Sequence, residues 1–172
     1  MPGSYTILHP LGSADDFALL KLKKEVKSRN FIRLSGEHHK IGQDSKLCIF
    51  GYPFDKYFQQ SKDKNEEAAT QWGVIREGRV VEVKGGEGKI LHQISTLPGH
   101  SGSPIIKIEE DGTLSIVGIH QGGSKDNYGR LVTPDFIKTV EAAATAIGAE
   151  FKATDCLEFE QAEPEECERE RR

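Results

Sequence analysis

The chain has 172 residues, 36% of them hydrophobic, which is enough for one medium domain or two small barrels with an apolar core. Its formal charge of −4 is uneven, because residues 154–172 carry a net −5 and the remainder carries +1. The nearly neutral body offers no basic face for nucleic acid, and no apolar run approaches the roughly 20 residues of a membrane-spanning helix.

The three cysteines, Cys48, Cys156 and Cys167, suggest no disulfide framework and lack the C-x-x-C spacing of a metal site. A sparse, odd number of cysteines leans towards a reducing compartment, and the first residues show no signal-peptide pattern. We expect no metal and no cofactor, and the sequence leaves the compartment and the oligomeric state open.

The first informative stretch, residues 17–22, is an apolar run that predicts a buried strand entered through Asp15 and Asp16. An acidic turn of this kind is also common as a solvated local cap. Further along, His38 and His39 lie in a polar loop. Adjacent imidazoles in an extended chain point to opposite faces, so this pair does not favour a metal site.

Apolar stretches bounded by turn residues predict strands and hairpins between residues 31 and 94. They are a strand at 31–34, a strand at 46–53, a hairpin over 71–83 that turns at Glu77-Gly78, and a hairpin over 80–94 that turns at Gly85-Gly86.

The most informative loop is residues 96–104, in which Ser101 is flanked by Gly99 and Gly102 and enclosed by two prolines. Glycines allow the positive-φ backbone that turns consecutive N–H groups towards one point, which is the geometry of an oxyanion hole. Taken alone, the pattern G-x-S-G more often marks a simple connection between two strands than a catalytic loop.

Downstream of this loop, residues 105–108 and 114–123 predict a strand pair joined by a turn at Asp111-Gly112. Thr133 followed by a proline marks the start of a helix, whose apolar residues recur at helical spacing as far as Ile147. The acidic residues 151–172 have little to bury, so we expect a disordered tail.

The block from Thr96 to Gly123, with its motifs G-x-S-G-S-P and G-I-H-x-G-G and the hairpin between them, resembles the second barrel of chymotrypsin-like serine proteases. Within these it is most similar to the glutamyl-endopeptidase branch. The resemblance implies a mostly β protein with the chymotrypsin-like antiparallel β-barrel fold, its second barrel complete and its first only partial, and a C-terminal α-helix. The domains expected are residues 1–40 as a remnant of the first barrel, residues 41–150 as the second barrel plus helix, and residues 151–172 as the tail.

The same resemblance implies three of the four parts of a serine protease site. Ser101 corresponds to the nucleophile, Asp16 to the carboxylate that orients the base, and the backbone N–H groups of Gly99 and Ser101 to the oxyanion hole. The histidine base lies several tens of residues before the aspartate in this family, whereas only 15 residues precede Asp16. None of the histidines present is a good substitute, and loss of this group costs on the order of 10⁶ in kcat.

The resemblance also implies a pocket for an acidic substrate side chain, lined by Thr96 and His120 at the positions that bind glutamate in this branch. Gln121, Gly122 and Gly123 complete the substrate-binding strand, although Gln121 stands where the branch usually has an aromatic residue. A hydroxyl and an imidazole can both donate to a carboxylate. Without the flanking motifs, His120 would be read as a core histidine bonded to its neighbours.

We therefore expect a serine endopeptidase that forms an acyl-enzyme at Ser101, cleaves polypeptides after acidic residues, and lacks its histidine base in a truncated sequence. Two alternatives stay open: a catalytically silent homologue that binds extended peptides, and a degenerate fragment without a function. Neither nucleic acid nor membrane is expected as a partner.

Overall fold

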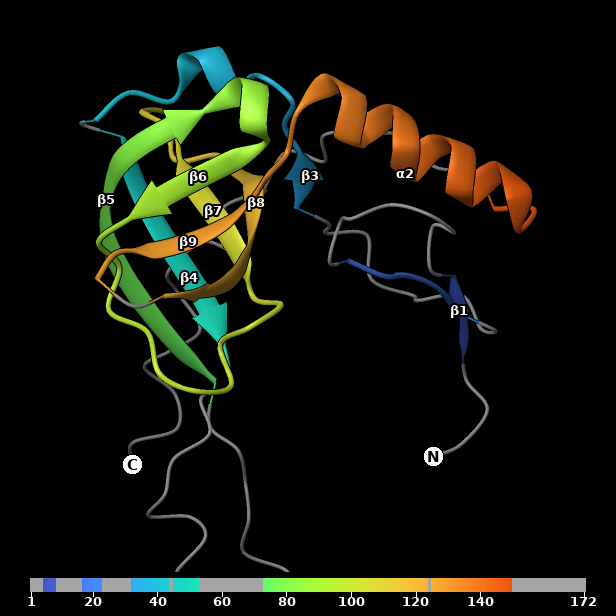
Figure 1. Cartoon of the computed structure of the whole chain (residues 1–172), viewed down its shortest axis with the longest axis horizontal. Coiled ribbons are helices and arrows are strands. Elements are labelled where there is room, and N and C mark those ends of the chain that lie inside the picture. The colour runs from blue at the N-terminus through green and yellow to red at the C-terminus, as the bar shows by residue number, and fades with distance from the viewer. Residues whose placement is uncertain are drawn as a thin grey trace, which may run out of the picture.

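A computed structural model describes residues 5–8, 17–22, 32–43, 45–52, 73–123 and 125–149 of the chain. Antiparallel strands β4 to β9 form a closed barrel, because β8 pairs with β7 on one side and with β9 on the other (Figure 1). The strands of the barrel are β4 (Lys46–Gly51), β5 (Val74–Lys84), β6 (Lys89–His92), β7 (Pro104–Ile108), β8 (Leu114–Gly123) and β9 (Asn127–Leu131).

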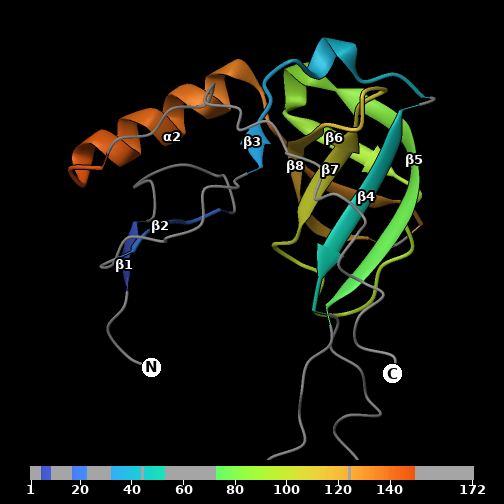
Figure 2. The ribbon, with the colours of Figure 1, turned by 180° about the vertical axis from the view of Figure 1, so that it is seen from behind.

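Smaller elements flank this barrel. Strands β1 (Tyr5–Leu8) and β2 (Leu19–Leu22) pair with each other as a separate antiparallel sheet, and β3 (Arg33–Leu34) adds to β8 in parallel. The remaining elements are the single-turn 3₁₀ helices η1 (His38–Lys40) and η2 (Gly85–Glu87) and the α-helix α2 (Pro134–Ala146). The helix and the β1–β2 sheet lie together beside the barrel (Figure 2).

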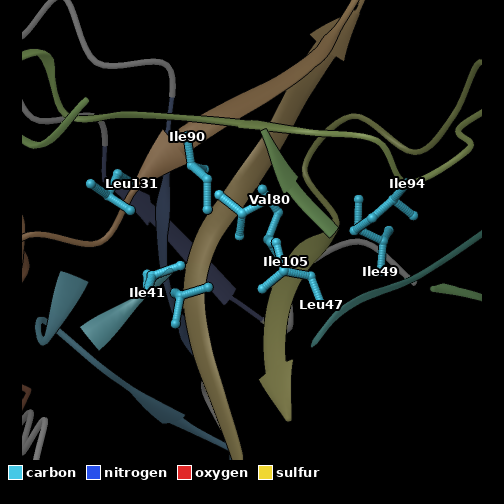
Figure 3. Close-up of a cluster of buried hydrophobic side chains, with 9 residues drawn as sticks. Ile41, Leu47, Ile49, Val80, Ile90, Ile94, Ile105 and Leu131 are labelled. Atoms are coloured by element: carbon cyan, nitrogen blue, oxygen red, sulfur yellow. The ribbon is translucent and has the colours of Figure 1, made fainter. Parts of the chain in front are cut away.

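Inward-facing aliphatic residues from every barrel strand fill the barrel core (Figure 3). In β4, Leu47 and Ile49 are fully buried, whereas the neighbouring Phe50 is exposed. Successive side chains of a strand point to opposite faces, so Phe50 lies on the outer face of the barrel. Each such side chain contributes about 1.5–3 kcal/mol through burial. The cluster comprises Ile41, Leu47, Ile49, Val80, Ile90, Ile94, Ile105, Val117 and Leu131.

Helix α2 packs against β2 and the residue Phe17 that precedes it. Phe136 packs edge-on against Phe17 with ring centroids 4.7 Å apart. At the other end of the helix, the Lys21 ammonium donates hydrogen bonds of 2.8 Å and 2.9 Å to the carbonyls of Ile147 and Gly148. A cation at a helix C-terminus also interacts favourably with the helix dipole.

The helix begins as its sequence predicts. Thr133 is the N-cap, its hydroxyl oxygen accepting from the N–H of Phe136 at 3.1 Å, and Pro134 follows it. Thr133→Ala is expected to lower the free energy of unfolding by about 1 kcal/mol in denaturant titrations, because the cap bond is lost. Thr145→Ala, at an exposed position near the helix end, is the control. Equal losses for the two variants would contradict the capping role.

The predicted hairpin turn at Glu77-Gly78 is wrong. Strand β5 runs straight through it, with Glu77 opposite Cys48 and Gly78 opposite Leu47 of β4. A glycine is required at residue 78 because the backbone of Ile94 passes close by. A Cβ at residue 78 would lie 2.8 Å from the Cα of Ile94. The turns at Gly85-Gly86 and Asp111-Gly112 are confirmed, the second with Gly112 at φ 84°.

Candidate active site

Ser101 lies on the loop between β6 and β7, exposed to solvent. Its neighbours Gly99 and Gly102 have φ values of 98° and 85°, a region that favours glycine. The sequence pattern G-x-S-G is therefore required by the backbone, and it presents the serine hydroxyl at the surface.

A pair of backbone hydrogen bonds joins this loop to the second motif on β8. The N–H of Gly102 donates to the carbonyl of His120 at 2.7 Å, and the N–H of His120 donates to the carbonyl of Ser103 at 2.9 Å. The Ser101 hydroxyl donates to the carbonyl of Gln121 at 3.2 Å. The two motifs recognised in the sequence thus meet in one site.

Some backbone N–H groups of the serine loop donate hydrogen bonds within the protein and others do not. Those of His100, Gly102 and Ser103 donate to carbonyls of Leu97, His120 and His100. Within the described parts of the chain, no backbone hydrogen bond is formed by the N–H groups of Gly99 and Ser101. These two donors are available for an oxyanion.

The His100 side chain points into the protein and stabilises the serine loop. Its ring is fully buried, and its Nδ1 accepts a hydrogen bond from the N–H of Leu97 at 2.9 Å. Gly51 on β4 leaves room for it, since a Cβ there would lie 2.9 Å from the His100 ring and would overlap the Ser103 hydroxyl. His100 is a structural residue of the loop.

The other expected catalytic groups are only partly visible. Asp16, the carboxylate expected to orient the base, lies outside the described residues. In the described part of the chain, no imidazole is hydrogen-bonded to the Ser101 hydroxyl, and no cluster of side chains could hold a metal ion. His38 and His39 lie in η1, where His38 Nδ1 contacts the carbonyl of Gly36.

Next to Ser101, the residues expected to line the pocket are held by two side chains that the sequence did not single out. The Thr96 hydroxyl donates to Asn127 Oδ1 at 2.9 Å, and His120 Nδ1 lies 3.2 Å from His92 Nε2. Gly123 makes room for Asn127, because a Cβ at residue 123 would overlap the Asn127 amide. Asn127 and His92 are also register partners on β9 and β6.

Burial controls the charge of the two paired histidines. The pKa of His92 is lowered to about 4, first by burial and then by the neighbouring His120. Burial also lowers the pKa of His120, as does His100, while a hydrogen bond to the backbone of Tyr128 acts in the opposite direction. Both rings are therefore neutral at pH 7.

A separate hollow of about 850 Å³ lies at the far end of β7 from Ser101. Its lining mixes cations such as Arg33 and Lys107 with acids such as Glu37 and Glu109. The mixed charge and the distance along β7 separate it from the serine loop.

The profile of the family described as "Trypsin-like peptidase domain" matches residues 4–119. The chain belongs to this family. As a member of this family it has the chymotrypsin-like fold, with the closed barrel and C-terminal helix expected from the sequence.

Two solved structures are similar to this chain. A Glu endopeptidase in complex with MPD aligns with TM-score 0.56 and 24% identity, covering 83% of this chain and 65% of that one. A tobacco vein mottling virus protease aligns with TM-score 0.44 and 18% identity, covering 81% of this chain and 58% of that one. The chain thus spans about 65% of the length of the Glu endopeptidase. No curated protein matches its sequence.

Among the described residues, no helix is both long and apolar enough to cross a membrane.

Proposed function

We propose that this trypsin-like peptidase is a serine endopeptidase that cleaves polypeptides through an acyl-enzyme at Ser101. The observation that carries the proposal is the exposed Ser101 between two positive-φ glycines, beside the unused N–H groups of Gly99 and Ser101. In this mechanism the Ser101 oxygen attacks the scissile carbonyl while its proton passes to a base, and the two N–H groups stabilise the oxyanion.

The base in this proposal is a histidine from a segment outside the given sequence, oriented by Asp16. No imidazole of the described residues is hydrogen-bonded to Ser101, whose hydroxyl donates to a backbone carbonyl instead. Without a base, the 172-residue chain alone would retain about 10⁻⁶ of the kcat, as in a serine protease that has lost its triad histidine.

An open strand edge beside Ser101 supports a polypeptide substrate. The last residue of β8 that pairs with β7 is Ile119, opposite Pro104, whereas among the described residues Gly122 and Gly123 pair with β9 alone. An extended peptide can add to such an edge through main-chain hydrogen bonds. The substrate would then run past Gln121 and across the serine loop.

Thr96 and His120 form the base of the pocket that we propose for the side chain preceding the cleaved bond. The resemblance to glutamyl endopeptidases favours an acidic side chain there. His120 is only 3% exposed, so only the end of a long side chain would reach it.

A catalytically silent peptide-binding module is the second candidate. It is favoured by the same Ser101–Gln121 hydrogen bond, which engages the hydroxyl without any general base in the described residues. In this candidate, the edge of β8 and the pocket bind an extended peptide that is never cleaved.

Labelling with a fluorophosphonate probe separates the two candidates. The full chain is incubated with the probe and increasing imidazole, which supplies the absent base from solution. We expect labelling that rises with imidazole, is lost in Ser101→Ala, and survives in the control Ser95→Ala, an exposed serine of the same loop. A folded chain that stays unlabelled at every imidazole concentration would contradict the endopeptidase.

A further inference from the structure

We infer that an exposed apolar patch at the end of β4 and the start of β5 binds the part of the polypeptide that follows the cleaved bond, so that large apolar side chains are preferred two or three positions after it. The patch consists of Phe50, Tyr52 and Ile75. The inference rests on the proposed function, because it takes Ser101 as the point of cleavage. It adds a contact with the same substrate on the side of Ser101 away from β8.

The three side chains of the patch form one apolar surface. Phe50 and Ile75 are opposite each other in the β4–β5 register, so they lie on the same outer face of the barrel. The Tyr52 ring packs edge-on against Phe50 with ring centroids 5.7 Å apart. The exposed fractions are 40% for Phe50, 50% for Tyr52 and 62% for Ile75. Exposed apolar side chains that cluster in this way mark interaction sites, whereas single ones do not.

Gly73, which precedes β5, leaves room for the two aromatic rings. A Cβ at residue 73 would lie 2.8 Å from two ring atoms of Phe50 and 3.5 Å from the Tyr52 ring. Any larger residue would displace the Phe50 ring. The shape of the patch therefore depends on the backbone at the start of β5.

The patch and the open edge of β8 lie on opposite sides of the serine loop. Strand β7, which follows this loop, pairs with β8 on one side and with β4 on the other. Towards β8, the carbonyl of Ser103 accepts from the N–H of His120 at 2.9 Å. Towards β4, Ser103 lies against Gly51, because a Cβ there would overlap its hydroxyl. Tyr52 directly follows Gly51, and the loop runs past this end of β4 (Figures 1 and 2).

An extended peptide that crosses Ser101 therefore meets both features. Its residues before the cleaved bond occupy the edge of β8, so its residues after the bond continue towards the end of β4. Each residue of an extended chain advances about 3.3 Å. Ser103, which contacts Gly51, is two residues from Ser101. The second and third residues after the cleaved bond are thus the ones that reach the patch.

The chemistry of the patch selects large neutral side chains. An aromatic side chain gains from burial and from edge-to-face contact with the rings of Phe50 and Tyr52. An acidic side chain is disfavoured, because the exposed Glu77 lies two residues from Ile75 on the same face of β5. The patch therefore differs in preference from the pocket proposed for the residue before the bond.

The test measures peptide binding to the full chain carrying Ser101→Ala, which prevents turnover. Three fluorescent hexapeptides share glutamate as their third residue, before the cleavage position. Their last two residues are both phenylalanine, both serine or both aspartate. We expect the phenylalanine peptide to bind at least about tenfold more tightly than the serine peptide, and the aspartate peptide to bind most weakly. A fourth peptide with its two phenylalanines before the glutamate controls for position.

The double variant Tyr52→Ser, Ile75→Ser tests whether the patch causes this preference. The ratio of phenylalanine to serine affinity should fall to near one, whereas Leu20→Ser, at an exposed leucine of β2, should keep the full ratio. All substituted side chains are exposed, and unfolding curves confirm that the variants fold. Equal binding of the two peptides to the parent, no binding of either, or an unchanged ratio in the double variant would overturn the inference.

A second copy of the chain is the competing occupant of the patch. The parent would then sediment as a dimer, Ile75→Ser would sediment as a monomer, and the phenylalanine peptide would gain nothing, which also overturns the inference. Failure of the proposed function is recognised separately. A folded chain that prefers the phenylalanine peptide but is never labelled at Ser101 contradicts the endopeptidase and leaves the patch as the binding surface of the silent module.

Discussion

Gly129→Ala is expected to lower the free energy of unfolding by about 3 kcal/mol, at the upper end of the usual cost of overpacking. A Cβ at residue 129 would overlap the backbone oxygen of Ile119 and approach Ile105 Cδ1 to 2.6 Å. The clash with a backbone atom cannot be relieved by rotating a side chain. Strands β8 and β9 must separate where Gly129 pairs with His120, so the loss should appear in both chemical and thermal unfolding.

The matched control is Gly86→Ala in η2, where a Cβ would meet nothing within 4 Å. Its stability should stay within about 1 kcal/mol of the parent, the scale of glycine-to-alanine entropy effects. Comparable losses at the two positions would show that the close approach of β8 and β9 is not what requires Gly129.

Stability should fall by about 3 kcal/mol between pH 7 and pH 4 because of His92. The pKa of His92 is about 4 in the folded protein and 6.5 as its ordinary value, so between these values the unfolded chain binds the extra proton. This contribution to stability is present in full above pH 6.5 and is lost as the pH falls towards 4. The lowered pKa of His120 acts in the same direction.

His92→Gln removes the titrating group, so unfolding free energies measured from pH 7 to pH 4 should decline less steeply than in the parent. His39→Gln, at an exposed position, is the matched control for removal of a histidine. An unchanged slope in His92→Gln would mean that another group causes the loss in acid.

Local patterns in the sequence predict the elements whose signals are themselves local. Thr133 with its proline defines the start of α2, and Asp111-Gly112 defines the β7–β8 turn, because cap and turn chemistry depend on a few adjacent residues. The predicted turn at Gly78 is wrong because the reason for this glycine is not local. Its glycine is required by Ile94, which is 16 residues away in the sequence and adjacent only once the barrel has formed.

The same distinction applies to the site. The motifs around Ser101 and His120 are contiguous, so the sequence could point to both, and the structure joins them by two backbone hydrogen bonds. The partners His92 and Asn127 come from β6 and β9 and have no motif of their own. Only the pairing of those strands shows that they determine the hydrogen bonds of Thr96 and His120. The role of Asp16 stays a prediction, since it lies outside the described residues.

The backbone of Ile94 forms two hydrogen bonds that have a consequence for how this region of the barrel can evolve. Its N–H donates to His92 and its carbonyl accepts from Asn127, the partners of His120 and Thr96, and every amino acid except proline supplies both groups. A substitution at residue 94 by any residue other than proline therefore leaves both hydrogen bonds in place. Inserting or deleting one residue between His92 and Thr96 would place a different peptide unit there and disrupt both hydrogen bonds at once. Changes of loop length, more than changes of the side chain at residue 94, would therefore alter the surroundings of Thr96 and His120.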